Sequence, residues 1–275
     1  MSYYIKCLIK EKCEVAENIF SLTLEMQSSD IIAKIRPGRF IMVWLPGIDE
    51  FPLSPSRYDH KSCSIEVTFK IRGEGTRALS SLNVGDKVFI RGPYGNGFKL
   101  PKTRQGYILL VGGGVGLAPL MPLIEELLSR KFKVKIIAGF RSSKAAFFLD
   151  RIGKMLDYQK CFIATDDGSL GLKGSAVDVA LKVLEEARPS YAYACGPEAM
   201  LFNLHKLLLN YNIPHQMLIE RYVKCAIGIC GSCAINGLRV CRDGPVFTDK
   251  VLRTLRDFGF YRRSPSGTRE ALLIS

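Results

Sequence analysis

Four of the nine cysteines fall in one short segment near the end of this 275-residue chain. Gaps of four, two and seven residues separate Cys225, Cys230, Cys233 and Cys241. Four thiolates are enough to ligate one [2Fe–2S] cluster, and gaps of four and then two residues are typical of plant-type clusters of this kind. Glycine and other small residues stand between the thiols, so that backbone N–H groups can approach the sulfurs. The segment therefore predicts an iron–sulfur cluster.

A structural zinc ion is the alternative ligand for the same four thiols. Zinc sites more often pair their cysteines as two short knuckles, and here only Cys230 and Cys233 form such a pair. The spacing favours the cluster and leaves zinc open. We also expect Ile227 and Ile229, which lie between the ligands, to shield the cluster from water.

Two glycine-rich segments have the composition of phosphate-binding loops. Gly112, Gly113, Gly114 and Gly116 follow an apolar strand and open a helix, where a pyrophosphate can approach the backbone. The second segment, residues 73–76, combines two glycines with a threonine ahead of helical residues, which is a small anion nest. Taken alone, either segment is as readily a plain turn.

The elements that must position these residues fall into three regions, which makes the predicted fold a multidomain α+β protein. Residues 1–100 contain short period-two strands separated by turns, which predict an antiparallel β-barrel. Residues 101–215 alternate strands with helices, which predicts an α/β domain with a parallel sheet. Residues 216–275 hold the cysteine segment and a basic tail, which is either a disordered end or a docking arm.

The net charge of +13 raises the question of nucleic acid, but the basic residues are spread along the chain and no helix-turn-helix, RNA-recognition or zinc-finger pattern is present. We expect anionic dinucleotides and an acidic protein partner instead, and no nucleic acid. The chain has no apolar stretch long enough for a membrane helix and no signal pattern, so we expect a cytoplasmic protein that does not bind membranes. Cysteines in such a protein do not predict disulfides.

In their order along residues 37–252, these motifs resemble the ferredoxin reductase superfamily, and most closely the electron-transfer subunits of type B dihydroorotate dehydrogenases. The resemblance implies that the barrel binds FAD and that the α/β domain binds NAD(H). Phe51 stands where many relatives carry arginine, so another basic group must make that contact. The flavin residues that the resemblance implies are Phe51, Pro52, Leu53, Ser54, Thr68, Phe69, Lys70, Gly75 and Thr76.

The resemblance also assigns nicotinamide-nucleotide contacts to the first glycine loop, to Asp166 and to one tight turn. That turn is Cys195-Gly196-Pro197, and the loop contributes Gly112, Gly113, Gly114 and Gly116. NADP stays open beside NAD, because Arg141 follows the second strand of the parallel sheet, where a 2′-phosphate would lie. By the same resemblance, Cys225, Cys230, Cys233 and Cys241 ligate the [2Fe–2S] cluster.

The implied function is electron transfer between NAD(H) and a catalytic, FMN-containing dihydroorotate dehydrogenase subunit, in a heterotetramer that serves pyrimidine biosynthesis. No acid–base constellation accompanies the chain's three histidines, so we expect no catalytic side chain. The open alternatives are a related subunit of a sulfide dehydrogenase, transhydrogenase or hydrogenase, a stand-alone oxygenase-type reductase, and a zinc-stabilised binding module without catalytic function.

Overall fold

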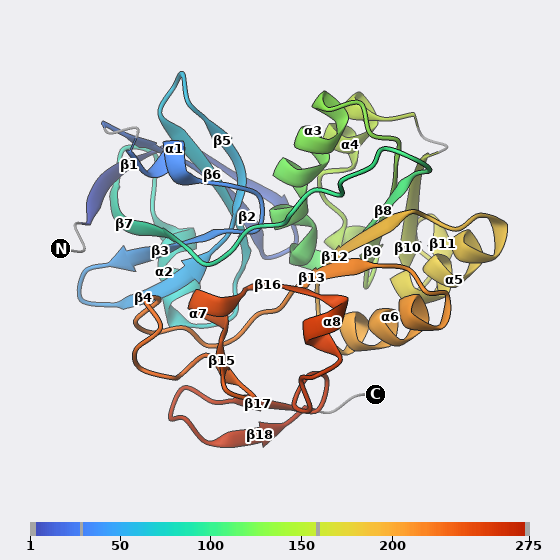
Figure 1. The fold of residues 1–275 in the computed structure, drawn as a ribbon. Helices are drawn as coiled ribbons and strands as arrows, with labels where there is room; N and C mark the ends of the chain where they lie inside the picture. Colours follow the sequence, from blue (N-terminus) through green and yellow to red (C-terminus); the bar gives the residue numbers. More distant parts are fainter. Residues whose placement is uncertain (1–3, 28–29, 158–159, 273–275) are drawn as a thin grey trace.

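The computed structural model describes residues 4–27, 30–157 and 160–272. Two seven-stranded sheets lie side by side, and the C-terminal residues cross beneath both of them (Figure 1). Among these residues, no helix combines the length and the apolar character that crossing a membrane requires.

The first sheet is antiparallel and has the order β4-β3-β7-β1-β2-β6-β5. Only Ser54 separates β4 from β5, although these strands are its two opposite edges. The sheet must therefore curl until its edges meet, which gives the predicted barrel. Its elements are β1 (Ile5–Ala16), β2 (Ile19–Met26), α1 (Asp30–Lys34), β3 (Phe40–Leu45), β4 (Asp49–Leu53), β5 (Pro55–Asp59), β6 (Ser64–Lys70), α2 (Glu74–Ser81) and β7 (Lys87–Tyr94).

The second sheet has the order β11-β10-β9-β8-β12-β13-β16, and every neighbouring pair is parallel except β13 with β16. Its first elements are β8 (Ile108–Gly113), the 3₁₀ helix η1 (Gly114–Leu120), α3 (Met121–Ser129), β9 (Val134–Phe140), η2 (Ser143–Ala145), α4 (Leu149–Met155) and β10 (Cys161–Thr165). The chain continues through β11 (Leu172–Lys173), α5 (Ala176–Glu186), β12 (Tyr191–Cys195), α6 (Glu198–Asn210) and β13 (His215–Leu218).

Helices cover both faces of this sheet because its central strands are apolar on both sides. In β8, Leu110 packs in the core on the side of α3, whereas Leu109 and Val111 pack in the core on the side of α5 and α6. This two-sided burial explains why β8 reads as a continuous apolar run rather than an alternating one.

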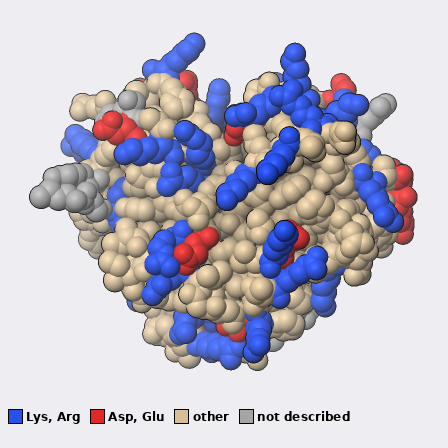
Figure 2. Space-filling model, in the orientation of Figure 1, with Lys and Arg blue, Asp and Glu red and all other residues tan. Residues whose placement is uncertain are grey.

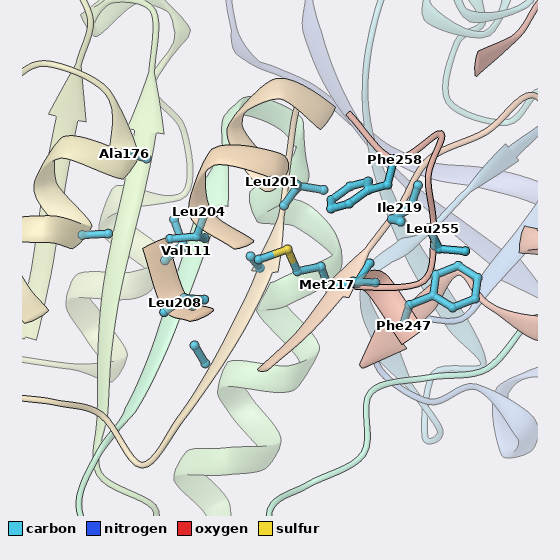
Figure 3. Close-up of a cluster of buried hydrophobic side chains, with 14 of the residues drawn as sticks. Val111, Ala176, Leu201, Leu204, Leu208, Met217, Ile219, Phe247, Leu255 and Phe258 are labelled. Carbon is cyan, nitrogen blue, oxygen red and sulfur yellow. The ribbon is translucent and has the colours of Figure 1, made fainter. Parts of the chain in front are cut away.

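The cysteine segment connects two neighbouring strands of the second sheet, β13 and β16. The chain leaves at Leu218, the end of β13, and returns at Val246, the start of β16, which pairs with β13. Met217, Phe247 and Phe258 belong to one buried cluster with residues of α6 (Figure 3). The remaining elements are β14 (Ala234–Ile235), β15 (Leu238–Arg239), α7 (Val240–Asp243), β16 (Val246–Thr248), α8 (Asp249–Leu252), β17 (Tyr261–Arg263) and β18 (Arg269–Ala271).

The basic tail ends in the antiparallel pair of β17 and β18. An ion pair of 2.6 Å between Arg269 and Asp257 and the packing of the Arg269 guanidinium on the Tyr261 ring hold this hairpin. The hairpin therefore has a defined structure up to residue 272.

Candidate cofactor-binding site

One cavity lies where the barrel, the parallel sheet and the cysteine segment meet. Eight of the nine residues predicted to contact the flavin line it, namely Phe51, Pro52, Leu53, Ser54, Thr68, Phe69, Lys70 and Thr76. The ninth, Gly75, is buried directly behind Phe51, where an added Cβ would lie 2.7 Å from the phenyl ring. Glycine at this position lets α2 pack against β4, so the first turn of α2 can border the cavity.

The wall beside α2 suits an anionic group. The Thr76 hydroxyl accepts hydrogen bonds from the N–H groups of Arg72, at 2.9 Å, and Gly73, at 3.2 Å. These bonds fix the turn that begins α2, whose first N–H groups have no partner within the helix. Lys70 and Arg72 add two cationic side chains to the same lining, whereas Arg221, which also lines the cavity, is paired with Glu198. Positive charge is therefore available although Phe51 replaces the arginine of many relatives.

The predicted nicotinamide loop lies beside this cavity. Gly112, the last but one residue of β8, lies opposite Cys195 of β12, and Val115 and Pro119 reach the cavity wall. The loop and the Cys195-Gly196-Pro197 turn touch, because a Cβ at Gly116 would lie 2.5 Å from the Gly196 Cα. The helix predicted to follow the glycine loop is a 3₁₀ helix, η1, up to Leu120 and becomes an α-helix only at Met121.

Asp166 does not reach the cavity. It follows β10, its side chain is exposed, and its N–H donates to the carbonyl oxygen of Phe140 at 3.1 Å. This places Asp166 at the carboxyl edge of the parallel sheet, next to Arg141 and two strands from the glycine loop of β8. Ligands of open α/β sheets bind along this edge, so an extended dinucleotide can span from Asp166 to the cavity.

The four clustered cysteines form two adjacent pairs. The Cys225 sulfur accepts from the N–H of Cys230 at 3.4 Å, and the Cys233 sulfur accepts from the N–H of Cys241 at 3.4 Å. In the described ranges, no three His, Cys, Asp or Glu side chains converge closely enough to hold a single metal ion. Two pairs fit a cluster that takes two thiolates on each of two irons, whereas a zinc site needs all four thiolates around one ion.

The backbone of this loop explains its small residues. Ala226, Gly228 and Gly231 all have positive φ, at 62°, 80° and 75°, which disfavours larger side chains. Burial acts to raise the pKa of the Cys230 thiol. Hydrogen bonds with the side chains and backbone of Ser232 and Cys225 outweigh burial, so this pKa is lowered. The ligand form of cysteine is the thiolate, which these hydrogen bonds favour at Cys230, whereas burial raises the pKa of Cys241.

Three family models match the chain in the order of its structural parts. They are an oxidoreductase FAD-binding domain over residues 6–98, an oxidoreductase NAD-binding domain over residues 110–206, and the iron–sulfur cluster binding domain of dihydroorotate dehydrogenase B over residues 220–252. A probable dihydroorotate dehydrogenase B (NAD(+)) electron transfer subunit of Methanothermobacter thermautotrophicus is 41% identical over 96% of this chain and 95% of its own length. The protein of the same description from Pyrococcus horikoshii is 42% identical, over 96% and 97%.

The chain belongs to the family of dihydroorotate dehydrogenase B electron transfer subunits. It carries the family's FAD-binding, NAD-binding and iron–sulfur-binding domains, as the sequence motifs predicted. Among solved structures, a chain of the NADH-dependent reduced ferredoxin-NADP oxidoreductase is similar over 89% of this chain and 88% of its own, with a TM-score of 0.79 and 25% identity. The cytochrome b5 reductase domain of Ulva prolifera nitrate reductase shares the fold, with a TM-score of 0.64 over 77% and 94%.

The expectation that two isoleucines shield the cluster of this family member is wrong. Ile227 and Ile229, which lie between the first two ligands, are 52% and 74% exposed. Cys230 is exposed with them, whereas Cys233 and Cys241 are buried beneath. The Cys225–Cys230 pair therefore lies closer to the surface than the Cys233–Cys241 pair.

The charged pairs at and near the site were missed from the sequence. Glu220 and Arg221 line the cavity, and Arg221 forms a buried ion pair with Glu198 at the start of α6. Arg91 forms another with Glu50, next to Phe51. The two residues are 23 positions apart in the first pair and 41 in the second, so no local sequence pattern predicts either pair. On the face shown in Figure 2, many other lysines and arginines lie scattered among uncharged residues rather than in one patch.

Proposed function

We propose that this chain transfers electrons between NAD(H) and a catalytic flavoprotein subunit through FAD and a [2Fe–2S] cluster, in the oxidation of dihydroorotate to orotate. One observation carries the proposal. Val223 and Val240 line the predicted flavin cavity, and the cluster thiols Cys225 and Cys241 follow them by two residues and one residue. The wall of the flavin site and the cluster loop are thus the same stretches of chain, which supports direct electron transfer between the two cofactors.

The chain's own residues would hold the cofactors rather than perform acid–base steps. The backbone of β4, the Phe51 ring and the first turn of α2 would bind the flavin, and Lys70 and Arg72 would neutralise its diphosphate. Bound FAD would supply hydride exchange with nicotinamide and single-electron exchange with the cluster. The contact between Gly116 and the Cys195 turn would set where the nicotinamide ring can enter.

The partner would dock on the exposed apolar residues that flank the Cys225 and Cys230 thiols in the sequence. Tyr222, Ile227 and Ile229 are large apolar residues that are 41%, 52% and 74% exposed beside the exposed Cys230. Exposed apolar groups gathered at one place mark interaction sites. We propose that this partner is the FMN-containing catalytic subunit, in a cytoplasmic heterotetramer.

The cofactor assignment is tested by metal and flavin analysis of the chain purified without oxygen. We expect about one FAD and two irons per chain, with flavin and iron–sulfur absorption bands. Cys230→Ser should lose iron and keep FAD, because Cys230 itself does not line the flavin cavity, whereas Cys13→Ser, at an exposed cysteine of β1, should keep both. A chain that contains zinc and neither iron nor flavin would refute the proposal.

The partner assignment is tested by adding the catalytic subunit. The isolated chain should oxidise NADH with artificial acceptors but should form orotate from dihydroorotate only in the complex. Ile229→Lys should weaken the complex at least tenfold, and Leu181→Lys, at a 38% exposed position of α5, should not. Orotate formation by the isolated chain would contradict this division of labour.

A further inference from the structure

Arg91 is a buried arginine at the junction of the barrel and the cysteine segment. It belongs to β7 and is 7% exposed. Its guanidinium forms a two-point ion pair with Glu50, with Nε 2.5 Å from Oε1 and Nη2 2.8 Å from Oε2. Glu50 lies in β4 directly before Phe51, so this half of the contact holds the strand of the predicted flavin segment.

The other edge of the same guanidinium reaches the cluster loop. Nη1 donates to the carbonyl oxygen of Cys225 at 2.9 Å, and Nη2 donates to that of Lys224 at 3.2 Å. Nη1 also donates to the Tyr94 hydroxyl at 3.1 Å, and the group lies 5.3 Å from the Tyr94 ring centre. The five N–H donors of an arginine are fixed in one plane, so these bonds define a single geometry.

The two charged groups of the Arg91–Glu50 pair lie on different sides of this contact. Arg91 donates two hydrogen bonds to the Glu50 carboxylate, and a guanidinium stays protonated in proteins, so Arg91 carries a permanent positive charge. The positive group contacts the peptide of Cys225, and the negative carboxylate stands behind it on the barrel. A cluster held by Cys225 gains negative charge on reduction, so the nearer positive group favours the reduced form.

We propose that Arg91 is a positioning residue that fixes the first cluster thiol against the flavin segment and, with its charge, raises the reduction potential of the cluster. The inference rests on the proposed function, because it assumes that Cys225 ligates the cluster. It assigns opposite electrostatic effects to the two members of one ion pair. An ion pair that only stabilises the fold has no such signature.

The test is the midpoint potential of the cluster, titrated by absorption and electron paramagnetic resonance in the full chain loaded with FAD and iron. Arg91→Met should shift the potential to more negative values, and Glu50→Gln should shift it to more positive values. Arg91→Lys keeps the charge but not the planar donors, so its potential should stay near that of the wild type while flavin-to-cluster electron transfer slows. Arg39→Met is the matched control.

Arg39 also donates to three backbone carbonyls, those of Lys34, Pro93 and Gly95, but all three lie in the barrel and not in the cysteine segment. Its variant should leave the potential unchanged. If Arg91→Met does not fold, the opposite shift in Glu50→Gln and the retained potential of Arg91→Lys decide the question. Shifts of the same sign in Arg91→Met and Glu50→Gln, or no shift in variants that keep their iron, would overturn the inference alone. Wild-type chain without iron and flavin would overturn the proposed function as well.

Discussion

Gly116 is the glycine at which one added methyl group should do the most specific damage to nicotinamide binding. Its Cβ would lie 2.5 Å from both the carbonyl carbon of Cys195 and the Cα of Gly196. Both are backbone atoms at the end of β12, so no side-chain rotation can relieve the overlap. The φ of Gly116 is outside the positive range, so alanine there meets no backbone strain. The whole effect of Gly116→Ala must come from pushing the glycine loop away from the turn.

Overpacking of this kind destabilises proteins by about 1–3 kcal/mol, and we expect the upper end because only backbone can move. A loss of about 3 kcal/mol would lower the Tm of a chain of this size by roughly 6 °C or more. If the loop relaxes instead, the displacement falls on the nicotinamide site. Each 1.4 kcal/mol of binding free energy lost weakens NADH binding tenfold, so we expect the Kd for NADH to increase at least about tenfold.

Gly114→Ala is the matched variant in the same loop. A Cβ at Gly114 would meet no protein atom within 4 Å, but its φ of +52° is left-handed, so folding with alanine there carries a conformational cost of roughly 1–2 kcal/mol. Thermal unfolding of the FAD-loaded chain and anaerobic NADH titration measure both effects. A Kd for NADH in Gly116→Ala within twofold of the wild type would refute the reasoning. A larger decrease of Tm in Gly114→Ala than in Gly116→Ala would refute it as well.

Three further perturbations test other parts of the structure. Gly75→Val should weaken FAD at least about tenfold, because its Cβ would lie 2.7 Å from a phenyl ring of the flavin segment, whereas Gly73→Ala, in open space, should not, as flavin release on dilution would show. Arg221→Met should lower the free energy of unfolding in urea by about 3–5 kcal/mol, because it leaves the Glu198 carboxylate, 14% exposed, without its ion-pair partner. Burial and a neighbouring histidine lower the pKa of His205 to about 4. Its unfolded form therefore binds a proton first, so up to about 3 kcal/mol of stability should be lost as the pH falls from 6.5 to 4, and His205→Gln should flatten that dependence in unfolding measured across this range.

The sequence predicted those strands whose burial follows a simple period. β6 alternates Ile65, Val67 and Phe69 toward the barrel core, and β8 is apolar on both sides. β1 was missed, although it is the longest strand, because only Cys7 and Ile9 of it are fully buried and register shifts interrupt its pairing with β2. Charged residues occupy its exposed face, so its pattern resembles that of a polar surface loop.

The site was predictable to the extent that it consists of contiguous motifs. The flavin segments, the glycine loop and the cysteines each carry their chemistry within a few residues, and eight residues of the flavin group converge on one cavity. What remained hidden depends on tertiary pairing. Nothing in the sequence near Arg91 indicates Glu50 or the carbonyl of Cys225, which is 134 residues away. The exposure of Ile229 was likewise misjudged, because apolar character alone does not say which side of a loop faces the protein.

The connections of the cysteine segment decide how the three parts can move against one another. The chain passes from Leu218, the end of β13, along the cavity wall to Cys225, so the cluster loop is tied covalently to the parallel sheet. Against the barrel domain it is held by Arg91 and by Asn96, whose backbone N–H donates to the carbonyl oxygen of Gly244 at 2.6 Å. On the opposite side of the junction, Arg151 of α4 joins Glu66 of β6 at 2.9 Å. A rotation of the nucleotide-binding sheet relative to the barrel that carries the cluster loop with it must therefore break these contacts. The interface that holds the cluster loop against the barrel therefore lies beside the cavity predicted for the flavin.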